Sequence, residues 1–160
     1  MKLFKDNAGR AWTVTLNVDA FKRVRSLLGV DLMEALEGNL LERMVSDPVL
    51  LCDVIYAVCK PEADARGITD EDFGRAMAGD AIEQATTAFL EELVDFFPLA
   101  RRRLLKKALE KLRDLEKRAL EAAERRLESP ELEAQMEEAL RDIGGFSGNS
   151  PGVSGSIPDP

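Results

Sequence analysis

Residues 47–61 read DPVLLCDVIYAVCKP, a strongly apolar run around which the fold is expected to form. Asp47 followed by Pro48 is a typical helix start, because an aspartate caps the first amides and proline fits the first helical position. The next three turns are nearly apolar on every side, up to Pro61. Such a helix is stable only when it is buried. We therefore expect a helix that ends at Pro61 and forms the centre of the core.

Helical periodicity continues on both sides of this run, from Val18 to Asp142, and breaks only at glycine or proline. After Pro98, about thirty residues run without either breaker and consist mostly of strong helix formers. Ser129-Pro130 then starts another helix. The periodicity predicts inward positions at Val18, Phe21, Val24, Leu27 and Leu28, and outward positions at Glu83, Glu91, Glu92 and Asp95.

The N-terminus has a different pattern. Residues 2–5 and 11–17 flank the loop DNAGR, and the second segment alternates apolar residues with small or polar ones. This predicts a β-hairpin with a loop of about five residues that contains glycine. A lone hairpin is marginal in water, so we expect Leu3, Phe4, Trp12 and Leu16 to pack on helices.

The sequence thus predicts a mainly α fold in three parts. Residues 1–97 form the hairpin and a helical core domain, and residues 98–143 form a long amphipathic charged helix and a following short helix. Residues 144–160 contain five Gly, four Ser and three Pro, which predicts a disordered tail.

Composition excludes many kinds of chemistry. The chain contains no histidine, which removes Ser-His, Cys-His and His-ligated metal mechanisms. Cys52 and Cys59 are too far apart along one helix for a disulfide and are expected to be buried thiols in a reducing cytosol. No nucleotide-binding or nucleophile motif occurs. We expect no enzyme, no cofactor and no metal site, and no segment resembles a signal peptide or a membrane span.

The charges are strongly segregated along the chain. Residues 31–97 carry net −12 and residues 98–118 net +6, within a total of −8. The basic cluster Arg101, Arg102 and Arg103 precedes the apolar stripe Leu105, Leu109 and Leu112, and these six residues are the candidate protein-binding site. The stripe either packs against its own domain or forms a seam for another helix. Nucleic-acid binding is disfavoured, because the chain is acidic overall and lacks interleaved aromatic residues.

Several short sequence segments together resemble one protein family. FKDNAGR-x-W at 4–12, V-x-LNV at 14–18, SDPVLL at 46–51, CKP at 59–61, DFG at 72–74 and SGNSP at 147–151 are similar to tail assembly chaperones of long-tailed bacteriophages and prophages. The resemblance covers most of the chain but contains no catalytic signature.

This resemblance implies a non-enzymatic chaperone in the host cytoplasm. Its partners would be the tape-measure protein, which it keeps soluble during tail assembly, and the tail-tube protein that later replaces it. A homo-oligomer is compatible with this role. The alternatives from the residues are a self-assembling helical scaffold and a nucleic-acid-binding regulator.

Overall fold

The computed structural model describes residues 1–144, which fall into two compact units. Unit 1 is Met1–Arg113 and unit 2 begins at Asp114. The described chain is mainly helical with one antiparallel two-stranded hairpin, which confirms the predicted fold class. The predicted tail at 145–160 lies outside the described residues.

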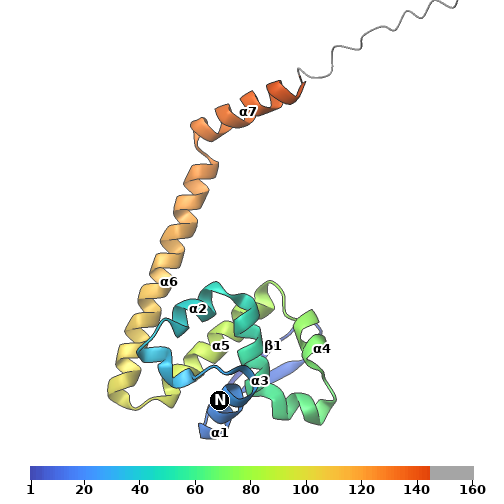
Figure 1. Cartoon of the computed structure of the whole chain (residues 1–160), viewed down its shortest axis with the longest axis vertical. Helices are drawn as coiled ribbons and strands as arrows, with labels where there is room; N and C mark the ends of the chain where they lie inside the picture. Colours follow the sequence, from blue (N-terminus) through green and yellow to red (C-terminus); the bar gives the residue numbers. More distant parts are fainter. Residues whose placement is uncertain (145–160) are drawn as a thin grey trace, which may run out of the picture. The chain divides into compact units, whose positions relative to one another are not determined.

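The elements follow in this order (Figure 1): β1 (Lys2–Lys5), β2 (Ala11–Val14), α1 (Val18–Leu28), the 3-10 helix η1 (Leu32–Leu36), α2 (Leu40–Ser46), α3 (Pro48–Arg66), α4 (Asp70–Arg75), α5 (Asp80–Phe96), α6 (Leu99–Leu127) and α7 (Pro130–Gly144).

Helix α3 is the centre of unit 1, as predicted. It contacts α1, α2, α4, α5 and β2. The Asp47 carboxylate accepts hydrogen bonds from the amides of Val49 and Leu50, at 3.0 and 3.1 Å. Leu51 and Val54 are among its buried side chains. The apolar run therefore forms the core because every neighbouring element covers part of it.

The predicted end of this helix at Pro61 is wrong, because α3 continues to Arg66. Proline has no N–H, so the carbonyl oxygen of Ala57, four residues earlier, loses its usual helical partner. Arg23 of α1 supplies a substitute: its Nη1 donates to the carbonyl oxygens of Ala57 and Val58, at 3.2 and 3.0 Å. A side chain from a neighbouring helix thus satisfies the backbone that proline leaves open.

The hairpin packs on the helices of unit 1 through one face. Phe4 lies opposite Trp12 in the register, and both rings meet Phe73 edge-on, at 6.4 and 5.0 Å between centroids. The second strand ends at Val14, earlier than predicted, although Leu16 beyond it is buried. Leu3 alternates to the other face and is 65% exposed, so its predicted packing is wrong.

Three positions differ from the helical pattern. Val18 and Leu27 are 61% and 50% exposed, because only the Phe21 side of α1 reaches the core. Glu92, predicted to face outward, is buried. Its Oε2 binds the amine of Met1 at 2.7 Å. The hairpin covers Glu92 and also supplies its partner, which periodicity within one helix cannot reveal.

The boundary between the compact units falls inside α6 at Arg113, whereas the sequence predicted a boundary between residues 97 and 98. The first turns of α6 belong to unit 1 because Leu105 and Leu109 are buried in its core. Within unit 2, the described residues of α6 and α7 include no buried side chain.

Replacing Leu51 tests the central position of α3. Leu51→Ala should reduce the free energy of unfolding by about 2–5 kcal/mol, because it leaves a cavity in the core. Val49 lies in the same helical turn but is 71% exposed. Val49→Ala should change stability by less than about 0.5 kcal/mol in the same urea titration. Equal losses for the two variants would contradict the assigned burial.

A double-mutant cycle tests the role of Arg23. Arg23→Ala should cost about 1–3 kcal/mol, because it leaves two buried carbonyl groups without this donor. Pro61→Ala restores an N–H to the helix, so the same Arg23 change should cost about 1 kcal/mol less in that background. Urea unfolding of the four proteins measures this difference. An identical cost in both backgrounds would show that Arg23 does not compensate for the proline.

Candidate functional site

The structure separates the three arginines that the sequence grouped. Arg102 turns back to the end of α5, where its Nη2 donates to the carbonyl oxygen of Asp95 at 2.7 Å and its Nε to that of Phe97 at 3.3 Å. Arg101 and Arg103 are exposed and form no ion pair within residues 1–144. Arg102 therefore holds the α5–α6 connection, and only Arg101 and Arg103 are available to a partner.

The leucines of the predicted binding stripe also differ in how far they are exposed. Leu105 is fully buried, Leu109 is 6% exposed, and Leu112 is half-buried against the same core. Of the two alternatives for this stripe, packing against its own domain holds for these leucines. Leu105 and Leu109 have almost no surface to offer, so as an exposed binding site they are wrong.

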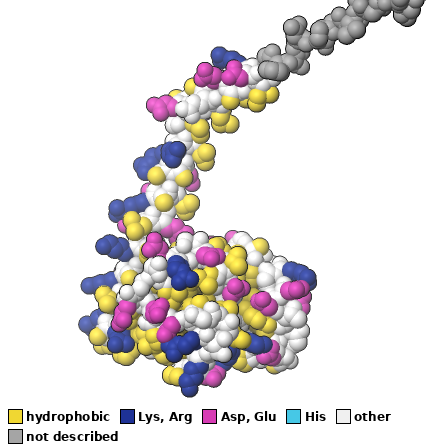
Figure 2. Space-filling view, viewed as in Figure 1, with side chains coloured by type: hydrophobic (Ala, Val, Ile, Leu, Met, Phe, Trp, Pro, Cys, Tyr) yellow, Lys and Arg dark blue, Asp and Glu magenta, His cyan; other side chains and the backbone are white. Residues whose placement is uncertain are grey.

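Exposed apolar side chains instead gather in unit 2. Leu115, Leu120 and Leu127 of α6 are between 56% and 70% exposed. On α7, Met136, Leu140 and Ile143 are 59%, 67% and 74% exposed. Figure 2 shows hydrophobic side chains along one side of α7, with charged groups on the other side. A concentration of this kind marks a surface that binds another apolar surface.

A cleft of about 680 Å³ lies within unit 2, where α6 ends and α7 begins. Ala123, Leu127 and Leu132 contribute apolar surface, and the charged residues Arg125, Arg126 and Glu131 also line it. The mixture suits an apolar side chain from a partner helix with polar groups around it. No grouping of nucleophile and base lies in this cleft.

Unit 1 has a smaller cleft of about 380 Å³ beside α5 and the first turns of α6. Lys2, Lys106 and Arg113 line it together with the acidic residues Glu91 and Glu110. Lys2 is paired with Glu91 at 3.0 Å. Because the opposite charges alternate, this cleft favours neither an anion nor a cation.

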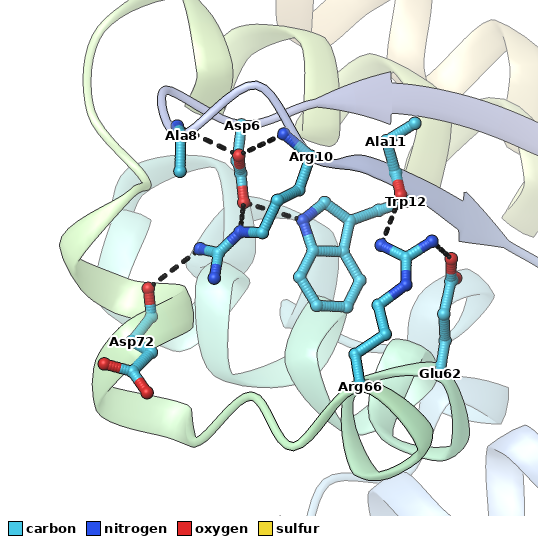
Figure 3. Close-up of polar contacts among 8 residues, drawn as sticks. All are labelled: Asp6, Ala8, Arg10, Ala11, Trp12, Glu62, Arg66 and Asp72. Atoms are coloured by element: carbon cyan, nitrogen blue, oxygen red, sulfur yellow. Dashed lines mark hydrogen bonds and ion pairs between the residues drawn. The ribbon is translucent and has the colours of Figure 1, made fainter.

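A buried polar cluster lies at the hairpin turn (Figure 3). The Asp6 carboxylate accepts hydrogen bonds from Trp12 Nε1 at 2.8 Å and from Arg10 Nε at 2.6 Å. It also accepts from the amides of Ala8 and Arg10. The guanidinium groups of Arg10 and Arg66 lie 5.7 and 5.2 Å from the centroid of the Trp12 ring.

This cluster is structural, because its acceptors are occupied by the protein itself. Burial alone would raise the pKa of Asp6, but the hydrogen bonds from Trp12 and Arg10 outweigh it and hold the pKa below its ordinary value. Sequence reasoning took Asp6 only as a turn former. The sequence signal for the cluster is an aspartate that opens a turn, with an arginine four residues and a tryptophan six residues later.

The Cys59 thiol and the acidic residues around 62–72 are also held in contacts within the protein. Burial raises the pKa of the Cys59 thiol to about 12, which suppresses the nucleophilic thiolate. The acidic residues around 62–72 pair locally, with Asp64 on Lys60 and Glu62 on Arg66. Within the described residues, no group of three or more potential ligands could hold a metal ion.

Asp6→Asn tests the cluster. The charged carboxylate stabilises the fold at neutral pH, because the pKa of Asp6 is lower in the folded chain than in the unfolded one. The substitution should cost about 1–3 kcal/mol at pH 7. The difference from the parent protein should shrink as the pH falls below 3.8, the ordinary value, and through the folded-state pKa.

Urea titrations at neutral and acidic pH measure this effect. Glu37→Gln removes an exposed carboxylate and should leave stability nearly unchanged at both pH values. A cost of Asp6→Asn that stays constant with pH would exclude the charge as its cause.

Among residues 1–144, no helix has the length and apolar character that crossing a membrane requires. Comparisons with protein-family models, with curated proteins and with solved structures found no match.

Proposed function

We propose that this protein is a non-enzymatic tail assembly chaperone of a long-tailed bacteriophage or prophage, which binds a tape-measure protein in the host cytoplasm and keeps it soluble. The sequence resemblance supports the tape-measure protein as the client and the tail-tube protein as the partner that displaces the chaperone. The exposed apolar surface of unit 2 supports binding to such a client.

The observation that carries the proposal is the exposed apolar surface of unit 2. A long helical client exposes an apolar stripe until it is assembled, and an amphipathic helix with its own exposed stripe can cover it. In α7, Leu132, Met136, Ile143 follow at spacings of four and seven residues, which places them on one face. Within the described residues of unit 2, no apolar side chain is buried in a core.

Charge supports the same role. The net charge of −8 disfavours aggregation of a complex whose apolar surfaces are covered. Arg101 and Arg103 remain exposed and can attract an acidic part of the client, which affects the rate of association more than its strength. Arg102 is excluded from this role by its bonds to the end of α5.

Co-production with the tape-measure protein of the same genome tests the proposal. The soluble fraction of the client should rise when the intact chaperone is present. Replacing Met136, Leu140 and Ile143 by serine should abolish most of this gain, because it removes the apolar face of α7 while leaving the core of unit 1 intact.

A matched control carries serine at Leu3, Val18 and Val49, which are equally exposed apolar residues of unit 1. This control should keep the client soluble. If the client is equally soluble with and without the intact protein, the chaperone function is wrong. If both triple variants lose activity, binding is not located on α7.

A further inference from the structure

We propose that α6 and α7 form the interface of a symmetric antiparallel dimer, in which the acidic α7 of one copy lies along the basic segment 99–113 of α6 in the second copy. The proposal concerns self-association and does not depend on the client. It rests on the charges, the exposed apolar positions and the lengths of these two helices.

The charges of the two segments are complementary. Residues 99–113 carry seven basic residues and one acidic residue, and residues 130–144 carry five acidic residues and one basic residue. Within the described chain, the only ion pair of α7 joins Arg141 to Glu137, at 3.6 Å. In segment 99–113, Arg102 is the only residue with an ion pair among residues 1–144. Both segments therefore present charges that a partner can neutralise.

Apolar side chains accompany these charges on both helices. In α6, Leu104, Ala108 and Leu115 lie on one face, beside the buried face of Leu105 and Leu109, and all three are exposed. In α7, the exposed apolar face has Glu133 on one flank and Asp142 on the other. Each helix thus offers an apolar stripe with flanking charges of one sign, which is the pattern of a specific helix pair.

The lengths fit a two-fold arrangement. When two α6 helices pair antiparallel over residues 114–127, an α7 that continues in the direction of its own α6 lies beside residues 99–113 of the other copy. Helix α7 has 15 residues, the same number as segment 99–113. The central segment 114–127 carries four acidic and four basic residues, so its pairing with a copy of itself meets no net repulsion. Ala119 and Ala122 lie at its centre, where small side chains allow a close approach.

The α7 that lies along segment 99–113 comes from a second copy, because the link between α6 and α7 is too short for α7 to reach this segment in its own chain. Only Glu128 and Ser129 connect α6 to α7. Folding back through this link would place α7 beside about the last 15 residues of its own α6, which are the neutral ones. The basic segment lies beyond this reach as long as α6 is helical. A symmetric pair also satisfies both copies equally, as closed homodimers do.

Sedimentation equilibrium of the full chain tests the dimer. The protein of 17.7 kDa should sediment at twice this mass, and added salt should weaken the association. One variant reverses α7 with Glu133→Lys, Glu138→Lys and Asp142→Lys. A second places acidic residues on α6 with Arg103→Glu, Lys107→Glu and Lys111→Glu, which cancels the net positive charge of segment 99–113. Each alone should raise the dimer dissociation constant more than about tenfold, because like charges now meet at the substituted positions.

Mixing the two variants should restore a dimer within about threefold of the parent dissociation constant, because opposite charges meet again at both ends. A control with Glu34→Lys, Glu37→Lys and Glu42→Lys makes the same charge change on exposed residues of unit 1 and should dimerise normally. Circular dichroism checks that all variants keep their helix content.

Three results would overturn the proposal. The first is a parent protein that remains monomeric at low salt. The second is a mixture of the two variants that does not associate, while one chain with all six changes regains the parent behaviour, because the contact would then lie within a chain. The third is a control variant that dissociates as strongly as the two interface variants.

Discussion

Burial of Leu105 and Leu109 in the core of unit 1 is the contact that divides α6 into a covered part and an exposed part. It holds the first turns of α6 in the domain and leaves Arg101 and Arg103 exposed to solvent. The apolar residues of α6 beyond Leu112 and all those of α7 lack such a core within the described chain. An exposed apolar helix face is unfavourable in water, so this surface favours a partner.

The helices and caps that depend on nearby residues alone could be predicted from the sequence. The central helix, the cap at Asp47 and the restart at Ser129-Pro130 all follow from periodicity and capping chemistry, and the structure confirms them. Sequence reasoning failed where a distant element decides the outcome. Helix α3 passes Pro61 because Arg23 of another helix replaces the missing donor, and Glu92 is buried because the hairpin covers it. Neither partner can be found from spacing within one helix.

The candidate site also combines a feature set by nearby residues with one set by a distant part of the chain. Periodicity located a leucine stripe on α6, but it could not tell which leucines the core would cover, and it chose the covered ones. The exposed members lie further along the chain, at Leu115 and beyond. A client and a second copy of this protein would compete for this surface. Self-association would then protect the apolar stripe until a client with a better match displaces the partner.

Hydrogen exchange of the full chain, with and without the proposed tape-measure client, tests the central proposal that residues 114–144 form the binding surface. In dilute protein without client, amides of this segment should exchange much faster than those of α3, because no core stabilises them. Addition of the client should slow exchange throughout 114–144 and leave α3 unchanged. Slow exchange of this segment in the free dilute monomer, or protection by the client that is confined to unit 1, would contradict the account.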